Sequence, residues 1–450
     1  MRLARGLVVI PVLAVLSWGC GQDTAGPSAI SESKTSLGGG DFDYIATPPF
    51  RKMMALQPKP AIAFPFCSPG VICYTPQLIR AAYNFPGNLD GTGQTILLVE
   101  PFGSPTIRQD LADFDAFFGI PDPPSFTILC PDGCPPFNAH NPHNELSWSA
   151  ETSLDVEYAH AMAPGANIVI VVAPTSSGNA VHSAEAKAIK LYPGSIMSQS
   201  FGIPEIVVRG NRVQLDQAHK NYQAAQAAGI TVLAGAGDAG ATNGFATANA
   251  EFPASDPLVT AVGGTQGDAY PGGLLGCGTS TCTGTYGGEQ VWNEPTFLAT
   301  PGATGGAPSL LFAVPSYQSG LNLASRTVPD VAYNAAVNGG VLIIDATLAP
   351  GFLFIAGGTS AGTPQWAAIV ALANQAKGSP LGFINPTLYQ IRKCASNYAA
   401  DFHDITVGNN QLLGTPVGFS ATVGYDFATG LGTPNVTNLI KDLATPPSCP

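Results

Sequence analysis

The chain has 450 residues, only 11% of them charged, and a formal net charge of -12. An acidic surplus without a basic patch argues against nucleic acid as a partner, because phosphate binding needs clustered Lys and Arg. The 52 Gly and 40 Pro residues indicate a loop-rich globular protein with a large core. One α/β unit with long loops fits this length and composition better than several domains.

The first residues have the pattern of an export signal. Arg2 and Arg5 precede an apolar core over residues 6–16, which is too short for a membrane span. The Gly-Cys pair that ends at Cys20 resembles the lipobox of bacterial lipoproteins. We therefore expect a signal peptide over 1–19 and a lipid on Cys20 as the protein's only membrane attachment.

Residues 20–70 show almost no periodicity and are polar, then glycine-rich, then proline-rich. This composition predicts a flexible tether. We place one globular domain over residues 71–450.

From Tyr74 onward, apolar runs typical of buried strands alternate with segments of helical periodicity. Such alternation predicts a mostly parallel sheet covered by helices on both faces, with ligands at the carboxyl ends of the strands. The expected strands are 95–100, 167–172, 195–200, 230–234 and 258–265, and the expected helices are 106–118, 150–163, 180–191 and 212–228.

Two carboxylates, Glu151 and Asp155, lie four residues apart on one expected helix and therefore on one face of it. If they are partly buried they share a proton, and the pKa of one of them rises. The alternative is a solvated acidic face. The near absence of Lys and Arg from 110 to 187 and the apolar character of the helix weaken that alternative.

A further carboxylate and a serine occupy loops where an α/β sheet presents catalytic groups. Asp238 follows a buried strand in a glycine-rich turn, where an Asx turn is the alternative role. Ser360 lies between two glycines and a helical run that we expect to begin at Pro364. A helix N-terminus favours a developing negative charge, although Thr359 or Ser360 could serve only as a helix cap.

Nine cysteines fall into four expected disulfides and one remainder. Three of the pairs enclose short loops, as in an exported protein, and the odd residue is Cys20. Zinc is the less favoured alternative, because the close pairs lie far apart in sequence. The expected disulfides are Cys67–Cys73, Cys130–Cys134, Cys277–Cys282 and Cys394–Cys449.

Six motifs in order from about Tyr74 to the C-terminus resemble those of the sedolisins, the serine-carboxyl peptidases. They are ETSLD with AMAPGA, SQSFG with Glu205, AGAGDAGA, FPASDPLVTAVGGT, PDVAYNA and GGTSAGTPQWAAIVALANQ. The resemblance implies a subtilisin-like three-layer α/β fold, with a mostly parallel central sheet flanked by helices. Sedolisins usually carry a long folded prosegment, for which the region between Cys20 and Tyr74 is too short and too polar.

Carried over to this sequence, the resemblance implies that Ser360 is the nucleophile and Glu151 its general base. Asp155 would orient Glu151, and Asp238 would be the oxyanion-hole partner. The chemistry is consistent, because a serine needs a base, the base needs an orienting group and the oxyanion needs donors. A histidine triad is the rival, but none of the six histidines precedes Gly-Thr as the subtilisin histidine does, and His160 we expect to be packed or hydrogen-bonded.

The same resemblance implies one structural Ca²⁺ ion near the C-terminus. Asp404 and Asp426 would supply carboxylates, and Ile405, Thr422 and Gly424 would supply backbone carbonyls, an all-oxygen set suited to this ion. Thr422 replaces a glycine that is common in the family. Without the family, two aspartates in glycine-rich loops would be read as turn formers.

We therefore expect an exported peptidase, either an endopeptidase or a tripeptidyl-type enzyme. It would be a monomer that acts on protein or peptide substrates at acidic pH, in the cell envelope or outside the cell. The alternative is a catalytically inactive surface protein that keeps the fold in order to bind peptides or glycans.

Overall fold

The computed structural model describes residues 71–140, 145–267, 274, 286–295 and 301–449, together with Ala46 and the backbone of β1 (Met53–Leu56) and β2 (Phe66–Ser68). These two strands fall within the range expected to be a tether. β1 pairs antiparallel with β19 (Leu353–Ala356) in a second, five-stranded sheet. The expected signal peptide and Cys20 lie outside the described residues.

An eight-stranded sheet forms the centre of the described structure, in the order β12-β11-β9-β7-β4-β6-β5 with β17 paired to β11. Every neighbouring pair in it is parallel except β11 with β12. This confirms the predicted mostly parallel sheet. Its strands are β4 (Thr95–Pro101), β5 (Phe126–Leu129), β6 (Asn167–Ala173), β7 (Ile196–Gln199), β9 (Thr231–Gly235), β11 (Thr260–Gly267), β12 (Glu289–Val291) and β17 (Val331–Asn334).

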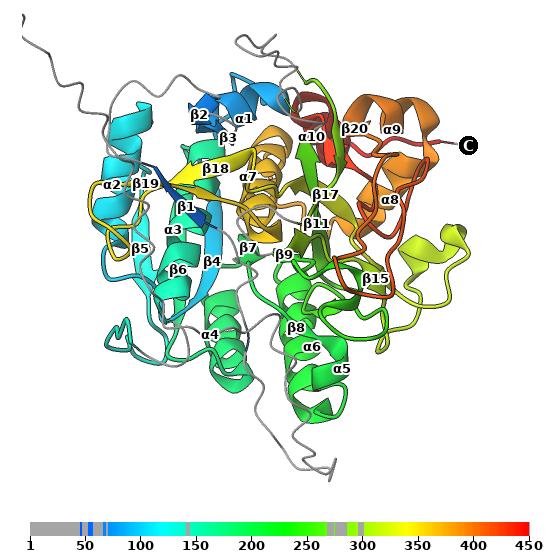
Figure 1. Cartoon of the computed structure of the whole chain (residues 1–450), viewed down its shortest axis with the longest axis horizontal. Helices are drawn as coiled ribbons and strands as arrows, with labels where there is room; N and C mark the ends of the chain where they lie inside the picture. The colour runs from blue at the N-terminus through cyan, green and yellow to red at the C-terminus, as the bar shows by residue number, and fades with distance from the viewer. Residues whose placement is uncertain are drawn as a thin grey trace, which may run out of the picture. The chain divides into compact units, whose positions relative to one another are not determined.

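Helices cover both faces of the sheet because its strands are apolar on both sides. In β4, Ile96 and Leu98 belong to the core shared with α3 (Glu145–Met162) and α7 (Thr359–Lys377). Leu97 and Val99 point the other way, into the core shared with α4 (Gly178–Leu191) and α6 (Arg212–Ala227). Figure 1 shows α4 and α6 side by side, away from α7. The result is the expected three-layer architecture.

The remaining elements are shorter and connect or border these layers. α2 (Ile107–Phe118) packs beside α3. The others are β3 (Val71–Tyr74), α1 (Pro76–Ala82), β8 (Ile203–Pro204), α5 (Glu205–Val208), β10 (Glu251–Phe252), β13 (Asn293–Glu294), β14 (Gly302–Ala303), β15 (Ala307–Pro308), β16 (Thr327–Val328), β18 (Gly340–Ile343), α8 (Asn385–Lys393), α9 (Ala395–Asp401), β20 (Phe402–His403), β21 (Thr433–Pro434) and α10 (Val436–Ala444).

The prediction that the serine helix begins at Pro364 is wrong, because α7 begins five residues earlier at Thr359. Proline lacks an N–H group, so Pro364 cannot bond the carbonyl of Ser360 one turn back. The first turn of α7 closes through the Ala361 N–H, which donates to the Gly358 carbonyl at 3.0 Å. Ser360 therefore lies inside the first turn of the helix.

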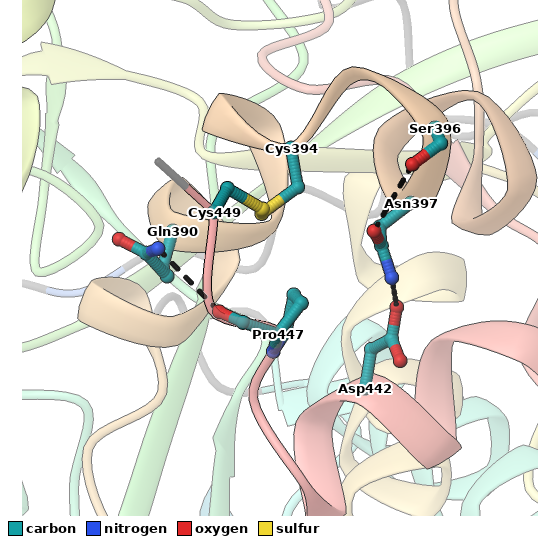
Figure 2. Close-up of a disulfide and its surroundings, with 7 residues drawn as sticks. All are labelled: Gln390, Cys394, Ser396, Asn397, Asp442, Pro447 and Cys449. Atoms are coloured by element: carbon teal, nitrogen blue, oxygen red, sulfur yellow. Dashed lines mark hydrogen bonds between the residues drawn. A yellow bond between two sulfur atoms is a disulfide. The ribbon is translucent and has the colours of Figure 1, made fainter.

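Two of the expected disulfides are present within the described residues. Cys130 and Cys134 are linked with Cα atoms 5.0 Å apart, and Cys394 and Cys449 with Cα atoms 5.5 Å apart. Figure 2 shows the second bridge at the junction of α8 and α9, close to where Gln390 Nε2 donates to the Pro447 carbonyl at 3.4 Å.

The other expected pairings lie partly or wholly outside the described residues. Cys73 is disulfide-bonded, and the side chain of its expected partner Cys67 is not described. Cys277 and Cys282 are likewise not described. Among the helices that are described, none is both long and apolar enough to cross a bilayer.

Candidate active site

The two helical carboxylates are fully buried. Glu151 and Asp155 are each 0% exposed, and α3 is enclosed by α2, α7 and the sheet. This rules out the alternative of a solvated acidic face. Burial disfavours the charged form of a carboxyl group, so both carboxyls have raised pKa values.

The serine is placed by a close approach of the backbone. A Cβ atom on Gly357 would lie 2.6 Å from the Ala336 carbonyl oxygen, and Gly358 has a φ of +107°, a region that side chains disfavour. The Gly358 N–H donates to the Ala335 carbonyl at 2.7 Å. Glycine at both positions allows β19 to turn sharply into α7, which places Ser360 at the helix N-terminus.

Asp238 connects the end of β9 to the same helix N-terminus. Its Oδ1 atom accepts the Thr359 N–H at 2.8 Å and the Thr359 hydroxyl at 2.9 Å. The Gly237 N–H donates to that hydroxyl at 3.2 Å. Asp238 thus accepts a first-turn N–H group, which has no acceptor within the helix. The donor, Thr359, directly precedes Ser360.

Glu151 and Ser360 face each other across α3 and α7. Burial and the neighbouring Asp155 raise the pKa of Glu151 well above its usual value, whereas the hydroxyl of Ser360 lowers it and Asp238 raises it further. Even so, neither oxygen of Glu151, nor Ser360 Oγ, completes a hydrogen bond of ordinary geometry with any described residue. The structure therefore brings the four predicted residues together and leaves a serine and a carboxylate poised to interact.

A third carboxylate, Glu100, belongs to this cluster and was missed by the sequence reasoning. It lies at the end of the central strand β4, is 0% exposed, and has a pKa raised well above normal by burial and by Asp155 and Glu151. Asp155 also accepts the Ser200 hydroxyl at 2.9 Å. The available signal was a carboxylate at the carboxyl end of an otherwise apolar strand.

His160 is a packed, hydrogen-bonded residue, as expected. Its ring is 0% exposed, and Nε2 lies 2.9 Å from the Pro121 carbonyl and 3.3 Å from Asp115 Oδ1. The Nε2 atom of His160 is therefore engaged by Pro121 and Asp115.

The residues expected to bind calcium converge on one loop. The Asp404 carboxylate accepts the Gly424 N–H at 2.9 Å, and the Asp426 carboxylate accepts the Thr422 N–H at 3.1 Å. Ile405 directly follows Asp404. Carboxylates are the hard oxygen donors that Ca²⁺ prefers, but here both accept backbone N–H groups. Within the described residues no cluster of three or more His, Cys, Asp or Glu side chains is arranged for a metal.

Comparison with known proteins gives consistent matches. The model of the subtilase family matches residues 139–415. Kumamolisin from Bacillus sp. (strain MN-32) is 33% identical over 440 residues, which span 94% of this chain and 72% of that protein. Tripeptidyl-peptidase 1 of Rattus norvegicus is 30% identical over 66% of this chain, a match that spans 52% of its own length.

Among solved structures, sedolisin from Pseudomonas, a serine-carboxyl proteinase in complex with two molecules of pseudo-iodotyrostatin, superposes with a TM-score of 0.71. The match covers 84% of this chain and 99% of that one at 24% identity. This similarity shows the fold.

Proposed function

The chain belongs to the sedolisin family of serine peptidases, within the subtilases, and we propose that it cleaves peptide bonds through Ser360. In this proposal Glu151 is the general base, Asp155 orients Glu151, and Asp238 partners the oxyanion. Glu100 extends the row of carboxyl groups behind Asp155. The substrates are proteins or peptides, cut internally or shortened from the N-terminus by tripeptides.

One observation carries the assignment of roles. Ser360 and Glu151 are fully buried and face each other, and no oxygen of either side chain completes a hydrogen bond of ordinary geometry with a described residue. A buried hydroxyl and carboxylate without partners cost free energy, which is typical of groups held ready for a reaction. The four residues come from three separate elements, so their meeting is a property of the fold.

The proposed reaction follows from this placement. Ser360 Oγ attacks the carbonyl carbon and passes its proton to Glu151, and the resulting oxyanion lies between Asp238 and the N-terminus of α7. Collapse of the intermediate breaks the C–N bond, and the leaving amine takes the proton from Glu151. A water molecule then attacks the acyl carbon and gives a proton to Glu151. The ester C–O bond breaks, the acyl group leaves as a carboxylic acid, and Ser360 Oγ takes the proton back from Glu151.

We propose an acidic working range from the family resemblance, because the reaction needs one carboxyl group ionised and another protonated. Glu100, Glu151 and Asp155 share a small buried volume and cannot all be charged, so they release their protons in steps that belong to the group as a whole. Activity needs Glu151 ionised and Asp238 protonated. Both conditions hold together only below neutrality if Asp238 titrates as an acid.

We further propose that the enzyme is exported, with its N-terminus attached to lipid at Cys20, and acts as a monomer in the cell envelope or outside the cell. The signal-like sequence and the two disulfides within the described residues support export. Sequencing the mature N-terminus tests this proposal. A terminus beyond Cys20 would contradict the lipid attachment.

One calcium ion is proposed at the loop around Asp404 and Asp426. The two carboxylates and the carbonyls of Ile405, Thr422 and Gly424 would hold it, and when bound it would stabilise the loop by linking residues that are distant in sequence. The four catalytic residues lie elsewhere in the chain, so no step of the reaction involves the ion.

The proposed activity is tested by incubating a denatured protein at pH 4 with wild type, Ser360→Ala and Ser319→Ala. Ser319 is an exposed serine whose hydroxyl donates to the Ser316 carbonyl, so its replacement is the matched control. We expect cleavage by wild type and Ser319→Ala and none by Ser360→Ala. Equal absence of cleavage in all three would favour an inactive binding protein.

A further inference from the structure

The threonine that precedes the nucleophile has a hydroxyl group with two fixed neighbours. Thr359 is 0% exposed, and its Oγ1 atom accepts the Gly237 N–H at 3.2 Å and donates to Asp238 Oδ1 at 2.9 Å. A hydroxyl group has one hydrogen, and a backbone N–H group can only donate. The hydroxyl hydrogen of Thr359 therefore points at Asp238 and not at Gly237.

Asp238 Oδ1 receives two hydrogen bonds from this one residue. The Thr359 N–H donates to it at 2.8 Å in addition to the hydroxyl at 2.9 Å, and Asp238 is 3% exposed. In a protonated carboxyl group the oxygen without the hydrogen is the better acceptor. Two donors at Oδ1 therefore favour the form of Asp238 that carries its acidic hydrogen on Oδ2.

The place of this hydrogen matters for the proposed reaction. An oxyanion is stabilised most by a donor that is already oriented before the reaction begins. A hydrogen on Oδ1 would face the two donors of Thr359, whereas a hydrogen on Oδ2 belongs to the oxygen that neither of these donors contacts. Thr359 thus decides which oxygen of Asp238 can act as the donor.

A glycine leaves room for the Thr359 hydroxyl. A Cβ atom on Gly235, the last residue of β9, would lie 3.0 Å from Thr359 Oγ1 and 3.4 Å from Oγ1 of Thr363, one turn later on α7. The two threonines are both 0% exposed, but the Thr363 hydroxyl donates to the Thr359 carbonyl at 2.9 Å. The two hydroxyls therefore share one buried environment and differ in their acceptors.

We propose that Thr359 is a positioning residue that confines the acidic hydrogen of Asp238 to Oδ2, from where it is donated to the oxyanion. This inference rests on the proposed function, because it concerns the oxyanion partner of the same site. Thr359 itself takes no part in the bond-breaking steps. A hydrogen bond to a charged acceptor is stronger than one to a neutral acceptor. The Thr359 hydroxyl should therefore also favour ionised Asp238 and affect the alkaline limb of the pH profile.

The test compares kcat and the pH dependence of kcat/KM in wild type, Thr359→Val, Thr359→Ser and the matched control Thr363→Val. Valine has nearly the shape of threonine but no hydroxyl, and serine keeps the hydroxyl. Thr359→Val should lower kcat about 2- to 10-fold, the range for one neutral hydrogen bond, and move the alkaline limb up by about half a pH unit to one unit. Thr359→Ser should keep the wild-type kcat and limb, and Thr363→Val should leave the limb in place.

A second comparison uses Asp238→Asn, in which the donor is an N–H on a fixed nitrogen and no acidic hydrogen has to be placed. Addition of Thr359→Val to this variant should lower kcat less than it does in wild type, whereas a loss of packing alone would have the same effect in both. Glu151 of α3 interacts with Asp238, and Glu251 of β10 lies against Gly237. Both of these ionisable groups stay unchanged in all the variants.

The outcomes separate this inference from the proposed function. Equal effects of Thr359→Val in the two backgrounds, or an alkaline limb that Thr359→Val leaves in place, would overturn the positioning role while cleavage that depends on Ser360 stands. Absence of cleavage by wild type would overturn the proposed function and this inference with it. If Thr359→Val does not fold, Thr359→Ala, which also lacks the hydroxyl, is measured in the same way and the same outcomes decide.

Discussion

At the scale of single residues, the site is a row of buried carboxyl groups. Glu100, Asp155 and Glu151 follow one another from the end of β4 toward Ser360, and each raises or lowers the pKa of its neighbour. Interaction with Glu100 lowers the pKa of Asp155. Burial and the neighbouring carboxyl groups raise the pKa of Glu100 well above normal, so we expect Glu100 to hold a proton that it can donate to Asp155.

Substitution of Glu100 tests this arrangement. Glu100→Gln keeps a donor that cannot titrate, so kcat should stay within a few-fold of wild type, whereas Glu100→Ala removes the donor and should lower kcat by about 10- to 100-fold, the cost of one charged hydrogen bond. Steady-state kinetics at acidic pH measures both. Glu157→Gln is the control, because this buried carboxyl on α3 accepts the Ile344 N–H at 3.1 Å instead. Equal losses in Glu100→Gln and Glu100→Ala would contradict the donor role.

The residues of the site differed in how well the sequence pointed to them. Glu151 and Asp155 follow from helical spacing, and Ser360 and Asp238 from glycine-rich turns after apolar runs, with roles supplied by family resemblance. Glu100 carries only a weaker signal, its place at the carboxyl end of an otherwise apolar strand. Its neighbours are set by contacts between segments that lie far apart in the chain, which a single sequence does not specify.

At the scale of elements, the spacing of apolar residues predicted the alternation of strands and helices correctly. β4, β6 and α6 begin at the predicted residues, because the two strands are apolar runs that follow glycine-containing turns and α6 follows an N-cap, Asn211. The sequence did not predict the start of α7 correctly. Contacts from Asp238 and Ala335 fix its first turn before Pro364, and such contacts outweigh the local preference for proline at a helix start.

The two described disulfides differ in the loops that they close, and this difference predicts unequal stabilisation. Cys394–Cys449 closes a loop with a sequence separation of 55 residues, and Cys130–Cys134 one of 4. Loop-closure entropy gives about 4 kcal/mol for the former and about 2 kcal/mol for the latter. Replacing both cysteines of each bridge by serine should therefore lower the free energy of unfolding more for the 394–449 pair.

Urea unfolding of the two double variants measures this difference. The short loop serves as the control for removing a disulfide as such. Equal losses of stability, or a larger loss for the 130–134 pair, would show that the bridge at the α8–α9 junction does not constrain the C-terminal segment drawn in Figure 2.

At the scale of the whole molecule, the proposed calcium ion should stabilise the native state. A ligand that binds only this state adds about 2.7 kcal/mol at a hundredfold excess over its Kd. Chelation should thus lower the melting temperature of wild type, and added Ca²⁺ should restore it. Asp426 also accepts the N–H groups of Ala428 and Thr429, both at 2.8 Å, so Asp426→Ala would destabilise the loop even without an ion.

The informative quantity is therefore the response to chelator in Asp426→Asn. We expect no further change of its melting temperature, whereas Asp401→Asn, which alters a carboxyl outside the proposed ligand set, should respond as wild type does. A wild-type melting temperature that does not change when chelator is added would contradict the proposed calcium site.

The central claim is that a carboxylate, not a histidine, activates Ser360, and the pH dependence of kcat/KM tests it most directly. The rate should rise as the cluster of buried carboxyl groups of Glu151, Asp155 and Glu100 loses its first proton. It should fall again as Asp238 ionises. The plot of kcat/KM against pH is then bell-shaped, with its maximum below pH 7. Asp238→Asn should move the alkaline limb to higher pH, because an amide donor does not titrate. An optimum above pH 8 in wild type, together with an unshifted alkaline limb in Asp238→Asn, would contradict the claim and point to a histidine base.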